Sequence, residues 1–132
     1  MEYIALFVGK FFLYYGVCML APRLLAVSPA DRFAFSVAWA ALRLTLGVLS
    51  TYPILLLIAW ADKSGLHPVL SFGAVMLLVR SLLWWLTARL IHERHNKVST
   101  PQTRNWVFIG VCASFLVDAI AWLSGANFKF FC

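Results

Sequence analysis

The sequence predicts an all-α integral membrane protein whose four transmembrane helices form a compact bundle. Of its 132 residues, 63% are hydrophobic and only 12% are charged, whereas a soluble domain carries about 25% charged residues. Four apolar stretches are also long enough to cross a bilayer, which takes roughly 20 helical residues. A soluble fold of this length could not bury so much apolar surface in its core, because small domains bury a limited share of their area.

The four predicted spans form one transmembrane domain that covers residues 1–132. They lie at about residues 3–21, 33–60, 67–91 and 106–123. Backbone groups in hydrocarbon must be hydrogen-bonded within their own segment, which favours helices here. The second span is longer than a bilayer requires, so we expect it to tilt or to bend near Pro53. The connections are short and leave little room for a soluble domain.

The longest connection, residues 92–105, is basic and predicts the orientation of the chain. The positive-inside rule places this loop in the cytoplasm, which gives an N-out, C-out topology. We expect the side chains around it to contact lipid headgroups; these are Arg89, His92, Arg94, His95, Lys97 and Arg104. Trp60 and Trp122 are expected at the outer edge of the membrane and Trp106 at the inner edge. The expected location is a bacterial inner (plasma) membrane.

Several classes of function find no support in the sequence. The net charge of +6 reports membrane topology rather than nucleic-acid binding, because no basic domain or nucleic-acid motif is present. His92 and His95 are three residues apart, but two ligands do not make a metal site. No serine has a histidine and an acid at matching depth for a catalytic triad. We therefore expect no cofactor and no metal, and the sequence favours a protein that is not an enzyme.

Each predicted span carries one ionisable residue away from its ends; these are Lys10, Arg43, Arg80 and Asp118. Intramembrane charges are costly, so they usually face the interior of a bundle, where they are paired or hydrated. At about 1.5 Å of rise per residue, all four fall within a layer about 7 Å deep. Small residues such as Gly47 and Ser114 share the faces of Arg43 and Asp118, which indicates close helix approach. We predict a shared polar node inside the bundle.

Three interpretations of these charges stay open at this level. Lys10 is near enough to the end of its span for its ammonium to reach the headgroups. Asp118 can pair with one arginine and so hold two helices together. Alternatively, the surplus of two positive charges can attract an anionic group of a substrate, a lipid or another protein. Two arginines suit bidentate capture of such a group.

The function expected from this pattern is that of a small, non-enzymatic accessory or partner-binding protein. A complex subunit, an assembly factor and an immunity or exclusion protein all belong to this class. The intramembrane node would contact the partner, which is another membrane protein or a second copy of the chain, and the lipid bilayer surrounds both. The first alternative is an oligomeric small transporter or channel for an anionic or weakly acidic solute. The second alternative is an enzyme that acts on a phosphate-bearing lipid.

Overall fold

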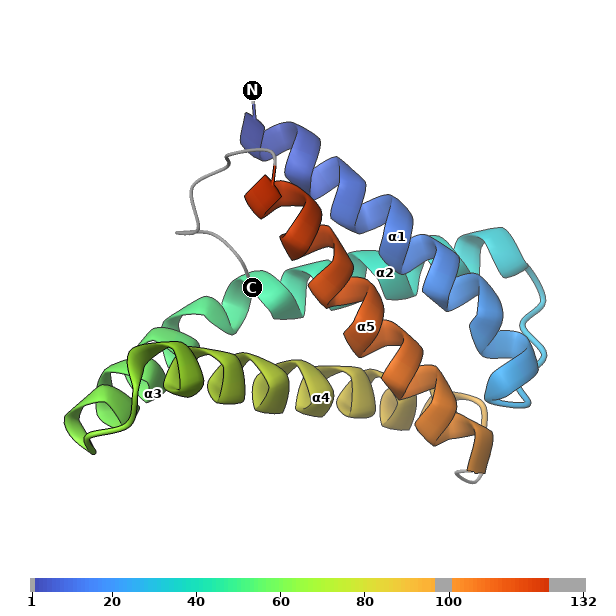
Figure 1. Cartoon of the computed structure of the whole chain (residues 1–132). Helices are drawn as coiled ribbons and strands as arrows, with labels where there is room; N and C mark the ends of the chain where they lie inside the picture. The colour runs from blue at the N-terminus through green and yellow to red at the C-terminus, as the bar shows by residue number, and fades with distance from the viewer. Residues whose placement is uncertain (1, 97–100, 124–132) are drawn as a thin grey trace.

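The protein is an all-α integral membrane protein, and four of its helices are long and apolar enough to cross a membrane (Figure 1). A computed structural model describes residues 2–96 and 101–123, and this part of the chain contains five helices and no strand. The helices are α1 (Glu2–Leu24), α2 (Arg32–Leu49), α3 (Thr51–Lys63), α4 (Pro68–Arg94) and α5 (Pro101–Leu123). Only α3, with 13 residues, is too short to be a span by itself.

The second span predicted from the sequence is divided into α2 and α3 at Ser50. Ser50 N–H donates to the Leu46 carbonyl and the Ile54 N–H donates to the Ser50 carbonyl, both at 3.0 Å. Pro53 explains the break, because it has no N–H to donate to Leu49 and its ring crowds that carbonyl. The helix therefore bends where the proline leads one to expect it.

The basic connection is shorter than the sequence predicted. Instead of a loop over residues 92–105, α4 continues through Arg94 and α5 already begins at Pro101. Proline is well tolerated in a first helical turn, because the first N–H groups of a helix have no intrahelical partner. Lys97 lies outside the described residues.

Side-chain contacts join the helix ends near this connection. His92 Nε2 lies 3.0 Å from Thr103 Oγ1, which links α4 to α5. The rings of Phe35 and His95 meet edge to face with 5.7 Å between centroids, which links α2 to α4. The basic residues at these helix ends are Arg23, Arg32, Arg89, Arg94 and Arg104. Most of the positive charge of the described residues thus gathers at one end of the bundle.

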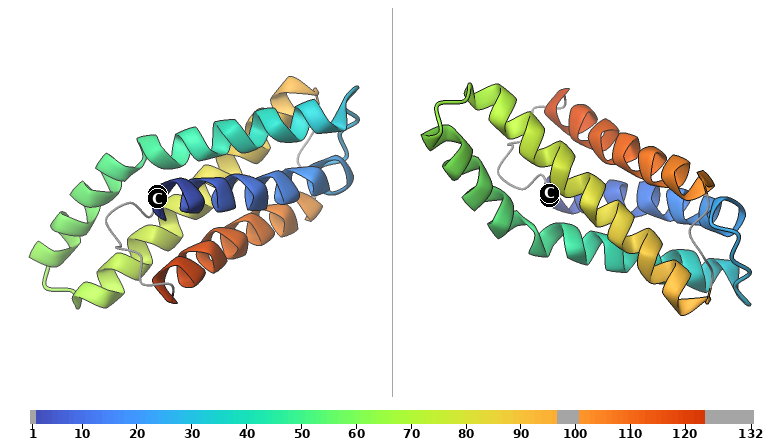
Figure 2. Two further views of the ribbon diagram at one scale, coloured as in Figure 1. Left: turned by 90° about the horizontal axis from the view of Figure 1, so that it is seen from above. Right: turned by 90° about the horizontal axis from the view of Figure 1, so that it is seen from below.

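The helices diverge from this end. Figures 1 and 2 show α1 and α5 side by side, with α2 on the other side of α1 and with α4 crossing the group. The hairpin of α3 and the first half of α4 extends beyond α1 and α5. Its turn requires Gly65, whose φ is +80°, a value that side chains disfavour. Ser71 Oγ donates to Asp62 Oδ1 at 2.7 Å and braces the two arms of the hairpin.

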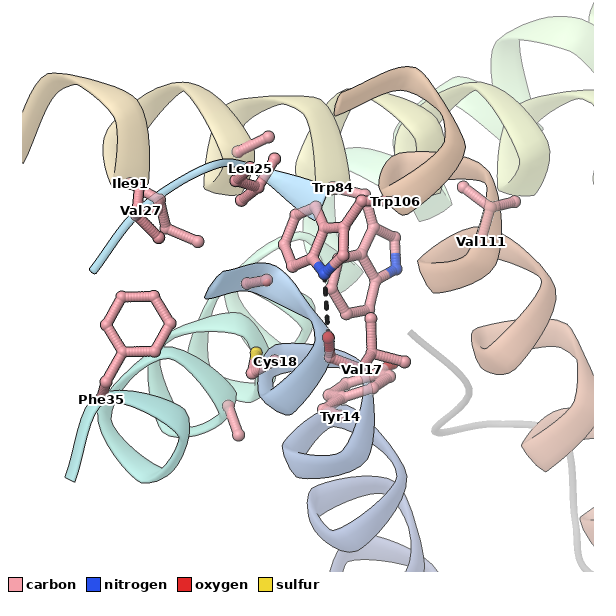
Figure 3. Packing of buried hydrophobic residues seen from close by; sticks show 13 residues of the cluster. Tyr14, Val17, Cys18, Leu25, Val27, Phe35, Trp84, Ile91, Trp106 and Val111 are labelled. Atoms are coloured by element: carbon pink, nitrogen blue, oxygen red, sulfur yellow. Dashed lines mark hydrogen bonds between the residues drawn. The ribbon is translucent and has the colours of Figure 1, made fainter. Parts of the chain in front are cut away.

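Three aromatic residues form the centre of the apolar core (Figure 3). The ring of Trp84 meets Tyr14 and Trp106 edge to face, with centroid distances of 5.3 and 5.2 Å. Trp106 Nε1 donates to the Val17 carbonyl at 2.8 Å and is fully buried. The sequence had placed this tryptophan at the inner membrane edge. A carbonyl partner satisfies its N–H inside the bundle, so it does not need the interface.

The structure describes the side chain of one of the two tryptophans predicted at the outer edge. Trp60 is 69% exposed, unlike the buried Trp106. The side chain of Trp122 lies outside the described residues.

Gly110 is a position where the core leaves no room for a side chain. A Cβ added there would overlap the ring of Trp84, whereas one added at Gly73 meets no atom of the described part of the chain within 4 Å. We expect Gly110→Ala to lower the free energy of unfolding by about 1–3 kcal/mol through overpacking. Gly73→Ala is the matched control and should be neutral or raise stability by about 1 kcal/mol. Tryptophan fluorescence during denaturation in mixed micelles measures both, and equal effects would contradict the packing.

Candidate functional site

Three of the four predicted intramembrane charges meet in one ion-paired cluster inside the bundle. Lys10 Nζ lies 3.1 Å from Asp118 Oδ1, and Arg80 Nη2 donates to Asp118 Oδ2. Lys10 and Arg80 are 1% and 3% exposed. Lys10 thus points into the bundle, which rules out the interpretation that its ammonium reaches the headgroups. One carboxylate joins side chains from α1, α4 and α5, and we call these three residues the ion-paired cluster.

A layer of polar and aromatic side chains lies one helical turn from the ion-paired cluster. It consists of Tyr14, Trp84 and Ser114, each four residues from the cluster member on its own helix. Residues four apart share one face of a helix, so the faces that bring the charges together also bring these three together. Trp84 Nε1 donates to Ser114 Oγ at 3.0 Å, and Ser114 Oγ lies 3.3 Å from the Tyr14 hydroxyl.

Trp84 is the member of this layer that sequence reasoning missed. It stands in a run of apolar residues that gives no sign of a polar partner. Its spacing of four residues from Arg80 was the available signal, because that spacing places the indole on the same inward face.

Arg43 lies apart from the ion-paired cluster and stacks on the aromatic layer. Its Cζ is 5.3 Å from the centroid of the Tyr14 ring and 5.0 Å from that of Trp84. Both distances fit cation–π contacts. Among the side chains that the structure describes, no carboxylate lies within 4.0 Å of this guanidinium, and its buried Nε and Nη1 have no hydrogen-bond partner. The expected four-residue node is therefore a triad and a neighbouring arginine.

The site holds more positive than negative charge. With every group ionised, the ion-paired cluster carries +1, and Arg43 brings the total to +2. In a low-dielectric interior such a surplus is costly unless an anion, water or an aromatic face offsets it. The Tyr14 and Trp84 rings supply part of that offset through their negative faces. Arg43 is thus the group through which this site would attract an anion.

The basic residues near the connection between α4 and α5 differ in how exposed they are. Arg94 and Arg104 are exposed, as is Arg89, which pairs with Glu93 at 2.9 Å. His95 is half-buried. These positions are compatible with headgroup contact.

His92 is the exception among the residues expected at the headgroups. It is only 5% exposed, because its Nε2 contacts Thr103 Oγ1 on α5. In the described part of the chain, no group of three or more His, Cys, Asp or Glu side chains converges, so no metal centre is assigned there.

We expect the buried ion pairs of the cluster to contribute far more to stability than the exposed pair on the surface of α4. Asp118→Asn leaves Lys10 and Arg80 buried without their carboxylate, and we expect a loss of about 3–5 kcal/mol in the free energy of unfolding. Glu93→Gln is the control, because its pair with Arg89 is exposed and contributes less than about 0.5 kcal/mol. Unfolding in mixed micelles measures both. If Asp118→Asn is as stable as the wild type, the cluster does not hold α1, α4 and α5 together.

Comparison with known proteins finds no relative of this chain. No protein-family model matches the chain, and no match is found among curated proteins or among solved structures.

Proposed function

We propose that this chain is a small, non-enzymatic membrane protein that binds another membrane protein, or a second copy of itself, through its transmembrane surface. A complex subunit, an assembly factor and an immunity or exclusion protein act in this way. The proposal places the chain in a bacterial inner membrane, with its basic end in the cytoplasm and both termini outside. The gathering of arginines at one end of the bundle supports that orientation, because positive residues are retained on the cytoplasmic side.

The observation that carries the proposal is an exposed face of α1 on which Ala5, Gly9 and Gly16 lie beside the exposed ring of Phe12, and which we call the small-residue face. All three small residues are exposed, and a Cβ added at either glycine meets no atom of the described residues within 4 Å. Glycine in a helix costs about 1 kcal/mol relative to alanine, and no tight contact among the described residues requires it here. In lipid, helices associate where small residues let their backbones approach closely. A helix of a partner lying along this face accounts for the glycines.

The ion-paired cluster supports this surface indirectly. Because Lys10 points inward to Asp118, Gly9 and Gly16 lie on the part of α1 that faces away from the bundle. The charges then serve to fix the orientation of α1, and the partner need not reach them. This differs from the sequence-based expectation that the node itself contacts the partner.

A second candidate function rests on a different observation, the surplus of positive charge near Arg43. An oligomer of this chain would use that charge to attract an anionic solute on its way across the membrane. In proteoliposomes, wild-type protein would then carry a chloride or phosphate flux that Arg43→Gln reduces at least tenfold. Arg104→Gln removes the same charge at an exposed site and should leave the flux unchanged. Wild-type protein that moves neither ion excludes this candidate for those solutes.

Association through α1 is tested by enlarging its small residues. Gly9→Leu and Gly16→Leu together should reduce the recovery of the partner, or of a differently tagged second copy, at least tenfold after extraction in native-lipid discs. The leucines hold the two backbones apart, which removes the close contact. Gly73→Leu makes the same change at an open position of α4 and should leave recovery unchanged. The proposal fails if wild-type protein is recovered alone and monomeric, or if all variants behave alike.

A further inference from the structure

A groove opens at the basic end of the bundle, between α2 and the end of α4. Its volume is about 420 Å³, which is within the range of small-molecule sites. One wall is apolar and runs along α2; its main members are Ala34, Ala38, Trp39 and Leu42. Arg94 and His95 line the end of the groove that lies at the end of α4. The groove therefore has an apolar wall along α2 and a cationic end formed by Arg94 and His95, which we call its mouth.

We propose that this groove binds one anionic phospholipid, with the lipid phosphate at Arg94 and His95 and an acyl chain along α2. The site is separate from the ion-paired cluster and from the small-residue face of α1. It does not depend on the partner-binding function proposed above.

The cationic mouth fits a phosphate. Arg94 is exposed and can offer two N–H groups to a phosphate at once, a geometry in which arginine surpasses lysine. His95 is held beside it by the ring of Phe35, at a centroid distance of 5.7 Å. Basic pockets between transmembrane helices on the cytoplasmic side are typical sites for anionic headgroups.

The acidic side chains near the mouth are already engaged. Asp31 caps α2 by accepting the N–H groups of Phe33 and Ala34 at 2.9 and 3.3 Å. Glu93 is paired with Arg89 at 2.9 Å. Arg32, the first residue of α2, adds a further exposed cation at this end. Three arginines thus stand against two carboxylates at this end, which leaves a net positive charge that complements an anionic headgroup.

The apolar wall fits an acyl chain rather than a free ion. Ala34, Ala38 and Leu42 follow one another at intervals of four residues, so they form one row along α2. The small side chains of the two alanines leave space above the row for an acyl chain, and Trp39 borders that space. From Ala34 to Leu42 the row is about 12 Å long, which is most of one leaflet of a hydrocarbon core about 30 Å thick. A soluble phosphate would have no use for this row.

The test is native mass spectrometry of the purified protein in detergent, with phosphatidylglycerol or phosphatidylcholine added at equal concentration. We expect one phosphatidylglycerol to be retained at least fivefold more than phosphatidylcholine. Arg94→Gln should abolish this preference, and its matched control, Arg104→Gln, should retain it, because both arginines are exposed at the same end of the molecule. Ala38→Phe should block the acyl row, whereas Ala41→Phe adds the same bulk to an exposed position of α2 outside the lining.

The outcomes distinguish a specific lipid site in the groove from a general attraction between the basic end of the protein and anionic lipid. Loss of the retained lipid with Arg94→Gln and Ala38→Phe, but with neither control, supports the groove. Equal retention of the two lipids, or an equal effect of Arg94→Gln and Arg104→Gln, overturns it. Displacement of phosphatidylglycerol by millimolar inorganic phosphate would assign the mouth to a free anion and also overturn the lipid proposal. Circular dichroism on each variant verifies that its helices are intact.

Discussion

The fold depends on one carboxylate, that of Asp118, which two cations from two other helices share. Lipid tails are as apolar as leucine side chains, so moving a side chain from lipid into a helix interface gains little free energy. Helix association in lipid therefore needs close packing and polar contacts. Asp118 supplies such contacts to both α1 and α4 through Lys10 and Arg80. Removing Asp118 would leave two buried cations without their counter-charge, whereas the loss of either cation leaves Asp118 paired with the other. The packing of the aromatic core follows from the registers that these contacts set.

Directly beside these charges lies a layer that links them to the apolar core. Trp84 belongs to both, because its ring packs against Trp106 while its N–H donates to Ser114. Gly110 makes room for that ring. Arg43 reaches the same layer from α2 and rests on the faces of Tyr14 and Trp84. Polar and apolar packing are therefore parts of one structure, in which all four membrane-length helices take part.

The surfaces that remain open are of two different kinds. The outward face of α1 offers small residues beside the apolar ring of Phe12, which suits close approach by another helix. The groove between α2 and α4 offers a cationic mouth and an apolar row, which suits an amphipathic molecule such as a phospholipid. The internal charges support both surfaces by fixing how the helices are rotated, and neither surface requires those charges to be exposed.

The sequence by itself determined the class of the protein, its four spans, the bend near Pro53 and the depth of its internal charges. Composition decides the class, and the length and rise of a helix decide the spans and the depths. Only the tertiary structure decided which charges meet, because depth along a helix does not determine its rotation or its neighbours. It separated Arg43 from Asp118, and it buried Trp106 and His92, which reach partners on other helices. Contacts between helices, rather than any local pattern, make those choices.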